Sequence, residues 1–247
     1  MKIHISPAII MRIREFGEAD LFVTFFTPDR GRLKGVAKGA RRSRKRFVNC
    51  LDIFSLVDLE FGLKRGGDLY FIHSGKLINA YPGLRSDFST LSRASYMIEL
   101  TEILFPWGMA DQEMFQLLKG SFHLLGKVGK GDLTSIIFEA KAMSLGGYGI
   151  NLEKCCVCGR TYTGQGMAVF KRERGGIACM KCQQESAVSP VMSPATVKLM
   201  ALIQSRLLDI LEDFEFTDEM MKEIKPVLKL HREYRLERRL KTFKYVE

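Results

Sequence analysis

The pattern of apolar residues changes once along the chain, near Pro82, and this change constrains the fold more than any other feature. Before it, short runs rich in Ile, Val, Phe and Thr are separated by turn signals, which is typical of β-strands. After it, apolar residues recur every three or four positions, which is typical of amphipathic helices. The sequence therefore predicts an α+β chain with two domains, residues 1–80 and residues 81–247.

Five strands are expected in the first domain, and Gly and Pro mark the turns between them, as in the run P-D-R-G at 28–31. The predicted strands span residues 5–16, 20–27, 32–38, 51–61 and 69–77. Five short strands in so short a stretch favour a small closed barrel, and a five-stranded OB-fold is the leading candidate. An SH3-like barrel remains the alternative, because strand counting does not separate the two.

Helical spacing dominates residues 81–247, and each apolar stripe there is expected to face a core. Helices are predicted near residues 91–105, 114–125, 133–140, 194–211 and 217–241. Asp132 is the expected N-cap of the third helix, and Pro226 is expected to kink the last helix or to mark its start. The second domain is therefore predicted to be α-helical, with a cysteine-rich insertion.

A cluster of basic residues overlaps the end of the third predicted strand and continues beyond it, in the stretch K-G-V-A-K-G-A-R-R-S-R-K-R at 34–46. It holds seven Lys/Arg and no Asp or Glu. A flexible loop with this charge can follow a phosphate backbone and release its counterions, although a basic loop that only keeps the protein soluble is the simpler interpretation. The candidate nucleic-acid-binding residues are Lys34, Lys38, Arg41, Arg42, Arg44, Lys45 and Arg46.

The net charge of +10 is concentrated in the same part of the chain. Residues 1–80 carry fifteen Lys/Arg against eight Asp/Glu, whereas residues 81–247 carry twenty-three against twenty. DNA or RNA is the expected polyanion, since no lipid-facing apolar helix accompanies the charge. A second basic stretch, residues 222–247, would extend a DNA path or receive an acidic partner, or would be an ordinary amphipathic helix with a solvated face.

Aromatic residues on the predicted strands are candidate stacking partners for unpaired bases, although such residues more often fill a barrel. Two adjacent pairs stand out, Phe25 with Phe26 and Tyr70 with Phe71. Because successive side chains of a strand alternate between its faces, one member of each pair is expected to point out of the barrel. The sequence does not select which one.

Two matched cysteine pairs, Cys155-x2-Cys158 and Cys179-x2-Cys182, lie twenty residues apart. Each pair can close on one metal ion from a tight turn, and four thiolates make the tetrahedral set of a zinc site. A zinc-ribbon-like module with one Zn²⁺ per chain is therefore expected at about residues 151–186. Four thiolates leave no open position for water, so this metal is expected to be structural rather than catalytic.

Two cysteines lie outside the matched pairs, and paired cysteines can serve purposes other than metal binding. Cys156 is an alternative ligand to Cys155, although the x2 spacing favours Cys155, and Cys50 is expected to be a buried small hydrophobe. Disulfides do not suit a cytosolic chain. A redox dithiol would not need two matched pairs.

No catalytic arrangement is recognisable in the sequence. The four histidines are scattered, and neither a Walker-type loop nor a dinucleotide-binding fingerprint occurs. No apolar run is long enough for a membrane span, and the N-terminus lacks the apolar stretch of a signal peptide. We therefore expect a non-enzymatic, cytoplasmic, nucleoid-associated protein with no membrane partner.

Four segments, taken with the predicted barrel and cysteine module, carry a resemblance to a known family. They are T-P-D-R-G-R-L-K-G-V-A-K-G-A-R-R-S-R-K-R-F at 27–47, R-A-S-Y-M-I-E-L at 93–100, F-E-A-K-A-M-S-L-G-G-Y-G-I-N-L-E-K-C-C-V-C-G at 138–159 and H-R-E-Y-R-L-E-R-R-L-K at 231–241. In this combination the chain resembles the RecO family of bacterial recombination mediators over nearly its whole length. The run F-V-N-C-L-D-I-F at 47–54 departs from the Gly-rich sequence of smaller residues that the family leads us to expect after the basic loop.

The resemblance implies an OB domain followed by an α-helical domain, with a four-cysteine zinc module in many members. It implies binding of single- and double-stranded DNA, annealing of complementary strands and, with RecR, loading of RecA onto strands covered by single-strand-binding protein. It also implies that the helical domain binds the acidic tail of that protein. In this sequence the seven basic candidates match the family's basic OB loop, and the four paired cysteines match its zinc positions.

Two other functions stay open from the sequence alone. A DNA-processing enzyme with a site assembled from distant carboxylates would cleave DNA in the presence of magnesium. A zinc-ribbon module in transcription or RNA metabolism would prefer a defined sequence or RNA over any single strand.

Overall fold

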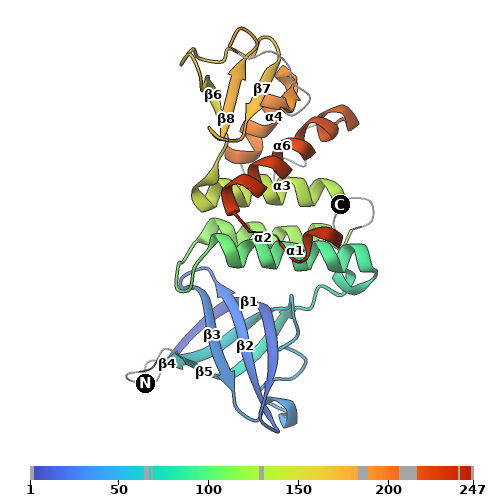
Figure 1. Cartoon of the computed structure of the whole chain (residues 1–247). Coiled ribbons are helices and arrows are strands. Elements are labelled where there is room, and N and C mark those ends of the chain that lie inside the picture. Colours follow the sequence, from blue (N-terminus) through green and yellow to red (C-terminus); the bar gives the residue numbers. More distant parts are fainter. Residues whose placement is uncertain are drawn as a thin grey trace. The chain divides into compact units, whose positions relative to one another are not determined.

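The structure is a computed structural model that describes residues 3–63, 67, 69–127, 131–182, 189–205, 216–238 and 240–245. The chain divides into two compact units, residues 1–128 and residues 129–245 (Figure 1). The first two helices therefore belong to the same unit as the N-terminal strands, and the boundary at residue 80 stays a prediction. Parts of three predicted features lie outside the described residues, namely the turn at 64–68, the end of the cysteine module at 183–186 and the helix end at 206–211.

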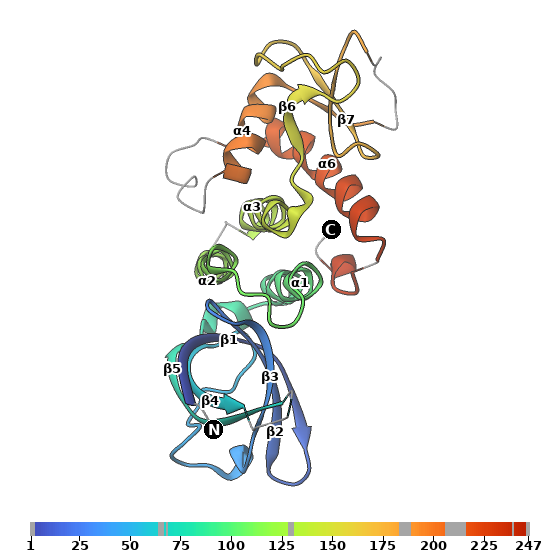
Figure 2. The ribbon, with the colours of Figure 1, turned by 90° about the vertical axis from the view of Figure 1, so that its left-hand side faces the viewer.

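Five strands form a closed barrel in the first unit (Figures 1 and 2). They are β1 (Ile3–Phe16), β2 (Asp20–Thr27), β3 (Gly31–Ala37), β4 (Leu56–Leu63) and β5 (Tyr70–Asn79). The order around the barrel is β1-β2-β3-β5-β4, and β1 pairs with β4 to close it. Neighbours are antiparallel except β3 and β5, which run parallel. This architecture confirms the OB-fold prediction over the SH3-like alternative.

The barrel interior is filled by side chains that alternate inward along the strands, among them Ile10, Phe25 and Phe61, each of which is fully buried. Cys50 packs in the same core, as expected for a small hydrophobe. Its burial raises the pKa of the thiol to about 11. The thiol is therefore protonated and unreactive at neutral pH.

The fourth strand begins at Leu56, five residues later than predicted. The residues before it form a turn in which Phe54 adopts a left-handed backbone with φ of 71°. Phe54 is buried, and its ring packs edge-on against Phe122 with centroids 5.6 Å apart. Its backbone N–H donates to the carbonyl of Ile10 at 2.7 Å. The alternating apolar residues of this segment predicted a strand, but its contacts with Phe122 and Ile10 hold it as a turn.

Two capped helices complete the first unit, α1 (Phe88–Leu104) and α2 (Gln112–Leu125). The Asp87 carboxylate accepts from the backbone N–H of Thr90 at 2.8 Å, and Asp111 accepts from that of Met114 at 2.7 Å. These are side-chain N-caps, which satisfy backbone donors that a helix leaves unpaired at its start.

In the residues that the structure describes, the second unit packs three helices against a four-stranded sheet of order β6-β8-β7-β9. The helices are α3 (Gly131–Met143), α4 (Pro194–Ser205) and α6 (Asp218–Leu236), and the strands are β6 (Asn151–Cys155), β7 (Ala168–Lys171), β8 (Gly176–Cys179) and β9 (Val191–Met192). One apolar core joins the two layers, with Phe170, Met200 and Val227 fully buried. Within the part of the chain that the structure describes, no helix is both long and apolar enough to cross a bilayer.

Three details of the predicted helices are corrected. Asp132 lies inside the first turn of α3 rather than at its cap, and it accepts a hydrogen bond from Lys225 Nζ at 2.9 Å. Pro226 does not start the last helix, because α6 begins at Asp218 behind a Thr217 cap. The same helix ends at Leu236 and not at residue 241, since the next residue has a positive φ of 48°.

Two isoleucines of β1 provide a test of the barrel core. Ile10→Ala should destabilise the first unit by about 2–5 kcal/mol, because it removes a fully buried side chain. Ile5→Ala removes the same atoms from a side chain that is 75% exposed and should cost less than about 0.5 kcal/mol. Urea unfolding followed by fluorescence reports this unit, because the only tryptophan of the chain, Trp107, belongs to it. Equal unfolding midpoints for the two variants would contradict the assignment.

Candidate nucleic-acid interface and metal centre

The basic loop, residues 38–46, is folded rather than extended. At its start Gly39 adopts φ of 65°, and its backbone N–H donates to the Asp20 carboxylate at 2.7 Å. At its end the carbonyl of Arg46 accepts from the N–H of Gly75 at 2.9 Å. The loop is therefore tied to the start of β2 on one side and to β5 on the other, which contrasts with the flexible loop expected from its composition.

Arg46 supports the shape of this loop as well as adding charge to it. Its Nη2 donates to the backbone carbonyl of Lys38 at 2.6 Å. Its guanidinium carbon lies 5.1 Å from the ring centroid of Phe47, which is buried in the barrel core. Replacing Arg46 would therefore alter the loop as well as remove a cation.

Arg41 and Arg42 each face a carboxylate near the turn between β1 and β2. Arg41 Nη1 lies 3.1 Å from Glu15 Oε2, and Arg42 Nη2 lies 3.5 Å from Glu18 Oε2. The four side chains are exposed, and ion pairs of this kind contribute only about 0–1 kcal/mol. A phosphate group can therefore displace these carboxylates at little cost.

The other four candidates are all exposed to solvent. Lys34 on β3, and Arg44 and Lys45 in the loop, are exposed, and none of the three has an ion-pair partner within the described residues. Lys38 Nζ lies 5.6 Å from the ring centroid of Phe71. The structure thus gathers the seven candidates along β3 and the loop that follows it.

The two aromatic pairs of the barrel are resolved by the structure. Phe25 and Tyr70 turn inward, and their ring centroids lie 5.2 and 5.5 Å from that of Phe61 in the core. Phe71 lies on the outer face and is partly exposed. Phe26 is also on the outer face of β2 but is fully buried, because it packs against the segment after α1. Of these four residues, Phe71 is the one that is both on the outer face and partly exposed, so it is the candidate for stacking.

The basic C-terminal stretch, residues 222–247, uses part of its charge internally. Arg232 is buried and donates from Nη1 to Glu139 Oε1 at 2.7 Å. Lys225 pairs with Asp132 at 2.9 Å. These contacts fasten α6 to α3, so this stretch serves the packing of the second unit in addition to any role at its surface.

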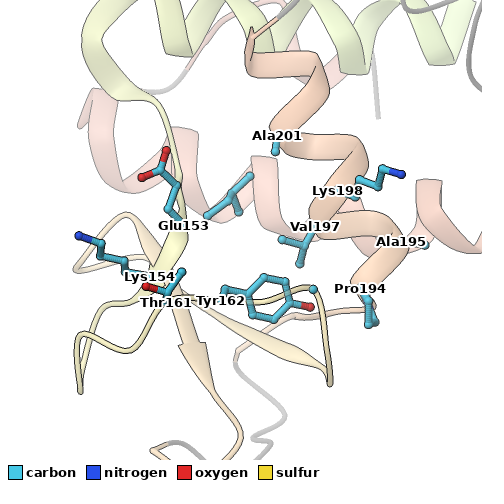
Figure 3. A pocket seen from close by; sticks show the side chains of 11 residues that line it. Glu153, Lys154, Thr161, Tyr162, Pro194, Ala195, Val197, Lys198 and Ala201 are labelled. Carbon is cyan, nitrogen blue, oxygen red and sulfur yellow. The ribbon is translucent and has the colours of Figure 1, made fainter.

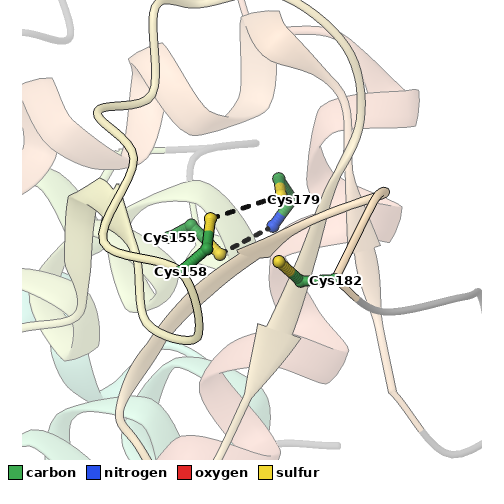
Figure 4. A group of neighbouring side chains, drawn as sticks. All are labelled: Cys155, Cys158, Cys179 and Cys182. Atoms are coloured by element: carbon green, nitrogen blue, oxygen red, sulfur yellow. Dashed lines mark hydrogen bonds between the residues drawn. The ribbon is translucent and has the colours of Figure 1, made fainter.

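The four paired cysteines converge at one end of the small sheet (Figure 4). Cys155 ends β6, Cys179 ends β8, and Cys158 and Cys182 lie in the turns that follow. Their sulfur atoms all lie within 4.8 Å of one another. Zinc–thiolate bonds of about 2.3 Å in a tetrahedron place sulfur atoms about 3.8 Å apart. The donor set therefore fits a tetrahedral metal ion with only small adjustments.

Backbone donors prepare Cys155 to act as a ligand. Burial raises the pKa of its thiol, but this effect is outweighed by backbone hydrogen bonds to the sulfur, and the pKa falls to about 6. One of these donors is the N–H of Cys179, at 3.3 Å. The thiolate, which is the metal-binding form, is therefore present at neutral pH. Hydrogen bonds to Cys158 and Cys179 raise the pKa of Cys182 to about 12, so this thiol is protonated at neutral pH and a metal ion would have to displace its proton.

Cys155, and not Cys156, joins the other three cysteines. The backbone N–H of Cys156 donates to the carbonyl of Ile177 at 2.7 Å, which pairs β6 with β8. Burial is the main cause that raises the pKa of the Cys156 thiol. The x2 spacing and the geometry therefore select the same residue.

An apolar pocket of about 600 Å³, which the sequence did not predict, lies in the second unit beside this module (Figure 3). It forms where β6 and the loop after it face α4, two segments that are some forty residues apart in sequence. Figure 3 shows the ring of Tyr162 lying across from Val197, with the amino groups of Lys154 and Lys198 at the margins. The pocket combines an apolar floor with basic edges, although Glu153 also lines it.

Comparison with known proteins identifies the family to which this chain belongs. A family model described as "Recombination protein O N terminal" matches residues 1–81, and one described as "Recombination protein O C terminal" matches residues 85–243. The DNA repair protein RecO of Syntrophus aciditrophicus is 30% identical over 249 residues, which cover 99% of this chain and 95% of that protein. That of Desulfatibacillum aliphaticivorans is 36% identical over 202 residues, which cover 78% of this chain and 76% of that protein. The chain therefore belongs to the recombination protein O family, whose role lies in DNA repair and recombination.

Proposed function

We propose that this protein is a recombination mediator that binds single- and double-stranded DNA through the basic loop and anneals complementary strands. The observation that carries the proposal is the loop itself, in which folded backbone holds the basic side chains together at the end of β3. Annealing brings two polyanions together, and a dense cationic surface lowers their mutual repulsion. No step of this function requires a catalytic group.

Arginine suits this task better than lysine, and the loop contains more of it. A guanidinium can grip a phosphate with two parallel hydrogen bonds or lie flat on a base. Phosphate contacts position a strand without reading its sequence, so little sequence preference is expected. The loop should therefore accept any complementary pair of strands, as a general repair protein must.

The family membership extends the proposal to partners. We expect the protein to act with RecR in loading RecA onto strands covered by single-strand-binding protein, in the cytoplasm at the nucleoid. We place the docking site for the acidic tail of single-strand-binding protein in the second unit. The pocket beside α4 supports this choice, because its apolar floor can take an apolar side chain while Lys154 and Lys198 attract an acidic chain.

The proposal assigns one structural Zn²⁺ to Cys155, Cys158, Cys179 and Cys182. Bound zinc would close the turns after β6 and β8 on each other and, with four thiolate ligands, would offer no position to a substrate. The chain's own contribution is to bring two pairs of sulfurs from separate turns into one set. The module would thereby hold β6 and β8 beside α4.

Salt dependence tests the electrostatic basis of DNA binding. If five to seven phosphates of a single strand are engaged, the plot of log affinity against log salt should have a slope of about −3.5 to −5. The double variant Arg44→Ala/Lys45→Ala removes two exposed cations and should reduce the magnitude of this slope by about 1.4. Lys119→Ala/Lys127→Ala removes the same charge from α2 and the residues after it and serves as control, with an unchanged slope. A flat salt dependence of the unmodified protein would reject the mechanism.

Annealing tests whether the loop performs the proposed task. Replacing Arg41, Arg42, Arg44 and Arg46 by Ala should slow the annealing of complementary oligonucleotides at least about tenfold, because the screening cations are lost. The assay uses fluorescent strands precoated with single-strand-binding protein. Arg46→Ala alone, compared with Arg46→Lys, separates loss of loop shape from loss of charge. Normal annealing by a folded quadruple variant would remove the loop from the mechanism.

Metal analysis tests the cysteine centre. The purified protein should contain one zinc per chain, and Cys158→Ser should lose it, whereas Cys156→Ser should keep it. Zinc should be released as the pH falls, because protons compete with the metal for the thiolates. A chelator should lower the melting temperature of the second unit. Retention of zinc by Cys158→Ser, or its loss from Cys156→Ser, would show that the ligand set is wrong.

A further inference from the structure

An exposed tryptophan lies against the outer face of β3, at the end of the strand opposite the basic loop. Trp107 is the only tryptophan of the chain, and it is 54% exposed in the segment between α1 and α2. The guanidinium carbon of Arg32 lies 4.1 Å from its ring centroid, and Lys34 Nζ lies 5.8 Å from the same centroid. A large aromatic side chain that is exposed and flanked by two cations is a candidate binding site for a ligand.

Backbone contacts hold this tryptophan in place. Trp107 forms a parallel β-bridge with Arg32, whose carbonyl also accepts from the N–H of Gly108 at 3.0 Å. Gly31 lets the two segments meet, because a Cβ at this position would lie 1.9 Å from the carbonyl oxygen of Met109. The main chain therefore fixes the indole beside β3 even though the residue is 54% exposed. Such a side chain is pre-organised for binding and would lose little freedom there.

Arg32 occupies one side of the indole. Its Nη1 donates to the carbonyl of Glu102 at 2.7 Å, which fixes the guanidinium plane, while its Nε is buried and has no hydrogen-bond partner among the described residues. With one face of the indole covered at 4.1 Å, the exposed area of Trp107 belongs to the opposite face and the ring edge. A second flat group can therefore stack on the open face, above a cation that favours a negative charge nearby.

The charges around the indole favour a nucleic acid. Glu102 accepts hydrogen bonds from Arg12 Nε at 2.7 and 2.9 Å, so its carboxylate is neutralised. Arg32 and Lys34 then remain to attract a phosphate. Both project from the outer face of β3, which leads directly to Lys38 and the basic loop. At about 3.3 Å per residue, the path from Arg32 to Lys38 is about 20 Å long.

A second aromatic–cation pair lies at the far end of this path. Phe71 of β5 is paired with Val36 of β3, and Lys38 Nζ lies 5.6 Å from the Phe71 ring centroid. The outer face of β3 thus has an aromatic ring with a cation at each end, and Lys34 between them. Stacking rings spaced along a basic groove are the general means of holding single strands without reading their sequence.

We propose that Trp107 is a stacking platform for an unpaired base of single-stranded DNA, with Arg32 and Lys34 holding the neighbouring phosphate. The proposal rests on the DNA binding proposed above and extends that site beyond the basic loop. It also gives the protein a means to distinguish unpaired from paired strands, because a base inside a duplex cannot expose its face to the indole. The loop would hold either form through phosphates, and Trp107 would add affinity only for the unpaired one.

Intrinsic fluorescence tests this in the unmodified, metal-loaded protein, since Trp107 is its only tryptophan. Oligo-dT should quench the emission, with the same midpoint as the anisotropy change of a labelled oligo-dT. A duplex of equal length should bind with much less quenching. Quenching by oligo-rU but not by oligo-dT would overturn the choice of DNA.

Three variants extend the test. Trp107→Ala should weaken binding of oligo-dT about five- to a hundredfold, which is the loss expected for one stacked base, and should leave duplex affinity nearly unchanged. Trp107→Phe keeps a stacking ring and should retain most of the affinity. Phe88→Ala removes an aromatic side chain that is 66% exposed elsewhere in the first unit and should bind normally. Circular dichroism melting confirms that each variant is folded.

The outcomes separate this inference from the proposed function. If oligo-dT binds but the emission is unchanged and Trp107→Ala binds equally well, the stacking role is overturned and DNA binding by the loop stands. If oligo-dT does not bind at all, both fail. If Trp107→Ala loses affinity for a protein of the repair pathway and not for oligo-dT, the surface is a protein-docking site and the inference is wrong.

Discussion

The parallel pairing of β3 with β5 is the contact on which the rest of the first unit depends. It joins Gly35 to Tyr70, Val36 to Phe71 and Ala37 to Ile72, and it closes the barrel. Gly35 is needed there, because a Cβ would lie 2.9 Å from the Ile72 side chain. Once β5 occupies the free edge of β3, the chain must leave the sheet after Ala37 and return as β4. The basic loop forms the first part of this crossing, so barrel closure decides where the charge is displayed.

The same closure arranges the outer face of β3. Arg32 and Lys34 point outward from this strand, and the neighbouring strand and the segment after α1 add one aromatic ring at each end. Glu15 and Glu18 near the β1–β2 turn pair with exposed arginines, so they moderate the charge of the loop without cancelling it. The result is a surface whose shape is set by backbone hydrogen bonds and whose charge would provide the affinity for nucleic acid that we propose. The second unit has its own core and its own sulfur centre, which suits a separate docking role.

Much of this could be predicted from the sequence, and the failures have physical reasons. The alternation of apolar and polar residues located the strands, and the two-residue spacing within each cysteine pair located the candidate metal-binding set. Both patterns depend on local geometry. The start of β4 was misplaced because Phe54 is held by Phe122, a contact distant in sequence. Trp107 escaped notice for the same reason, since Arg32 precedes it by seventy-five residues and no local pattern links them. The pocket beside α4 likewise exists only once β6 and α4 meet.

A cationic surface on the barrel is proposed to bind nucleic acid chains through their phosphates. Equilibrium titration of the intact, zinc-loaded protein with unrelated single-stranded oligonucleotides in low-salt buffer tests it most directly. The account predicts similar, tight binding to every sequence of equal length. An absence of binding under these conditions, or binding restricted to one sequence, would contradict it.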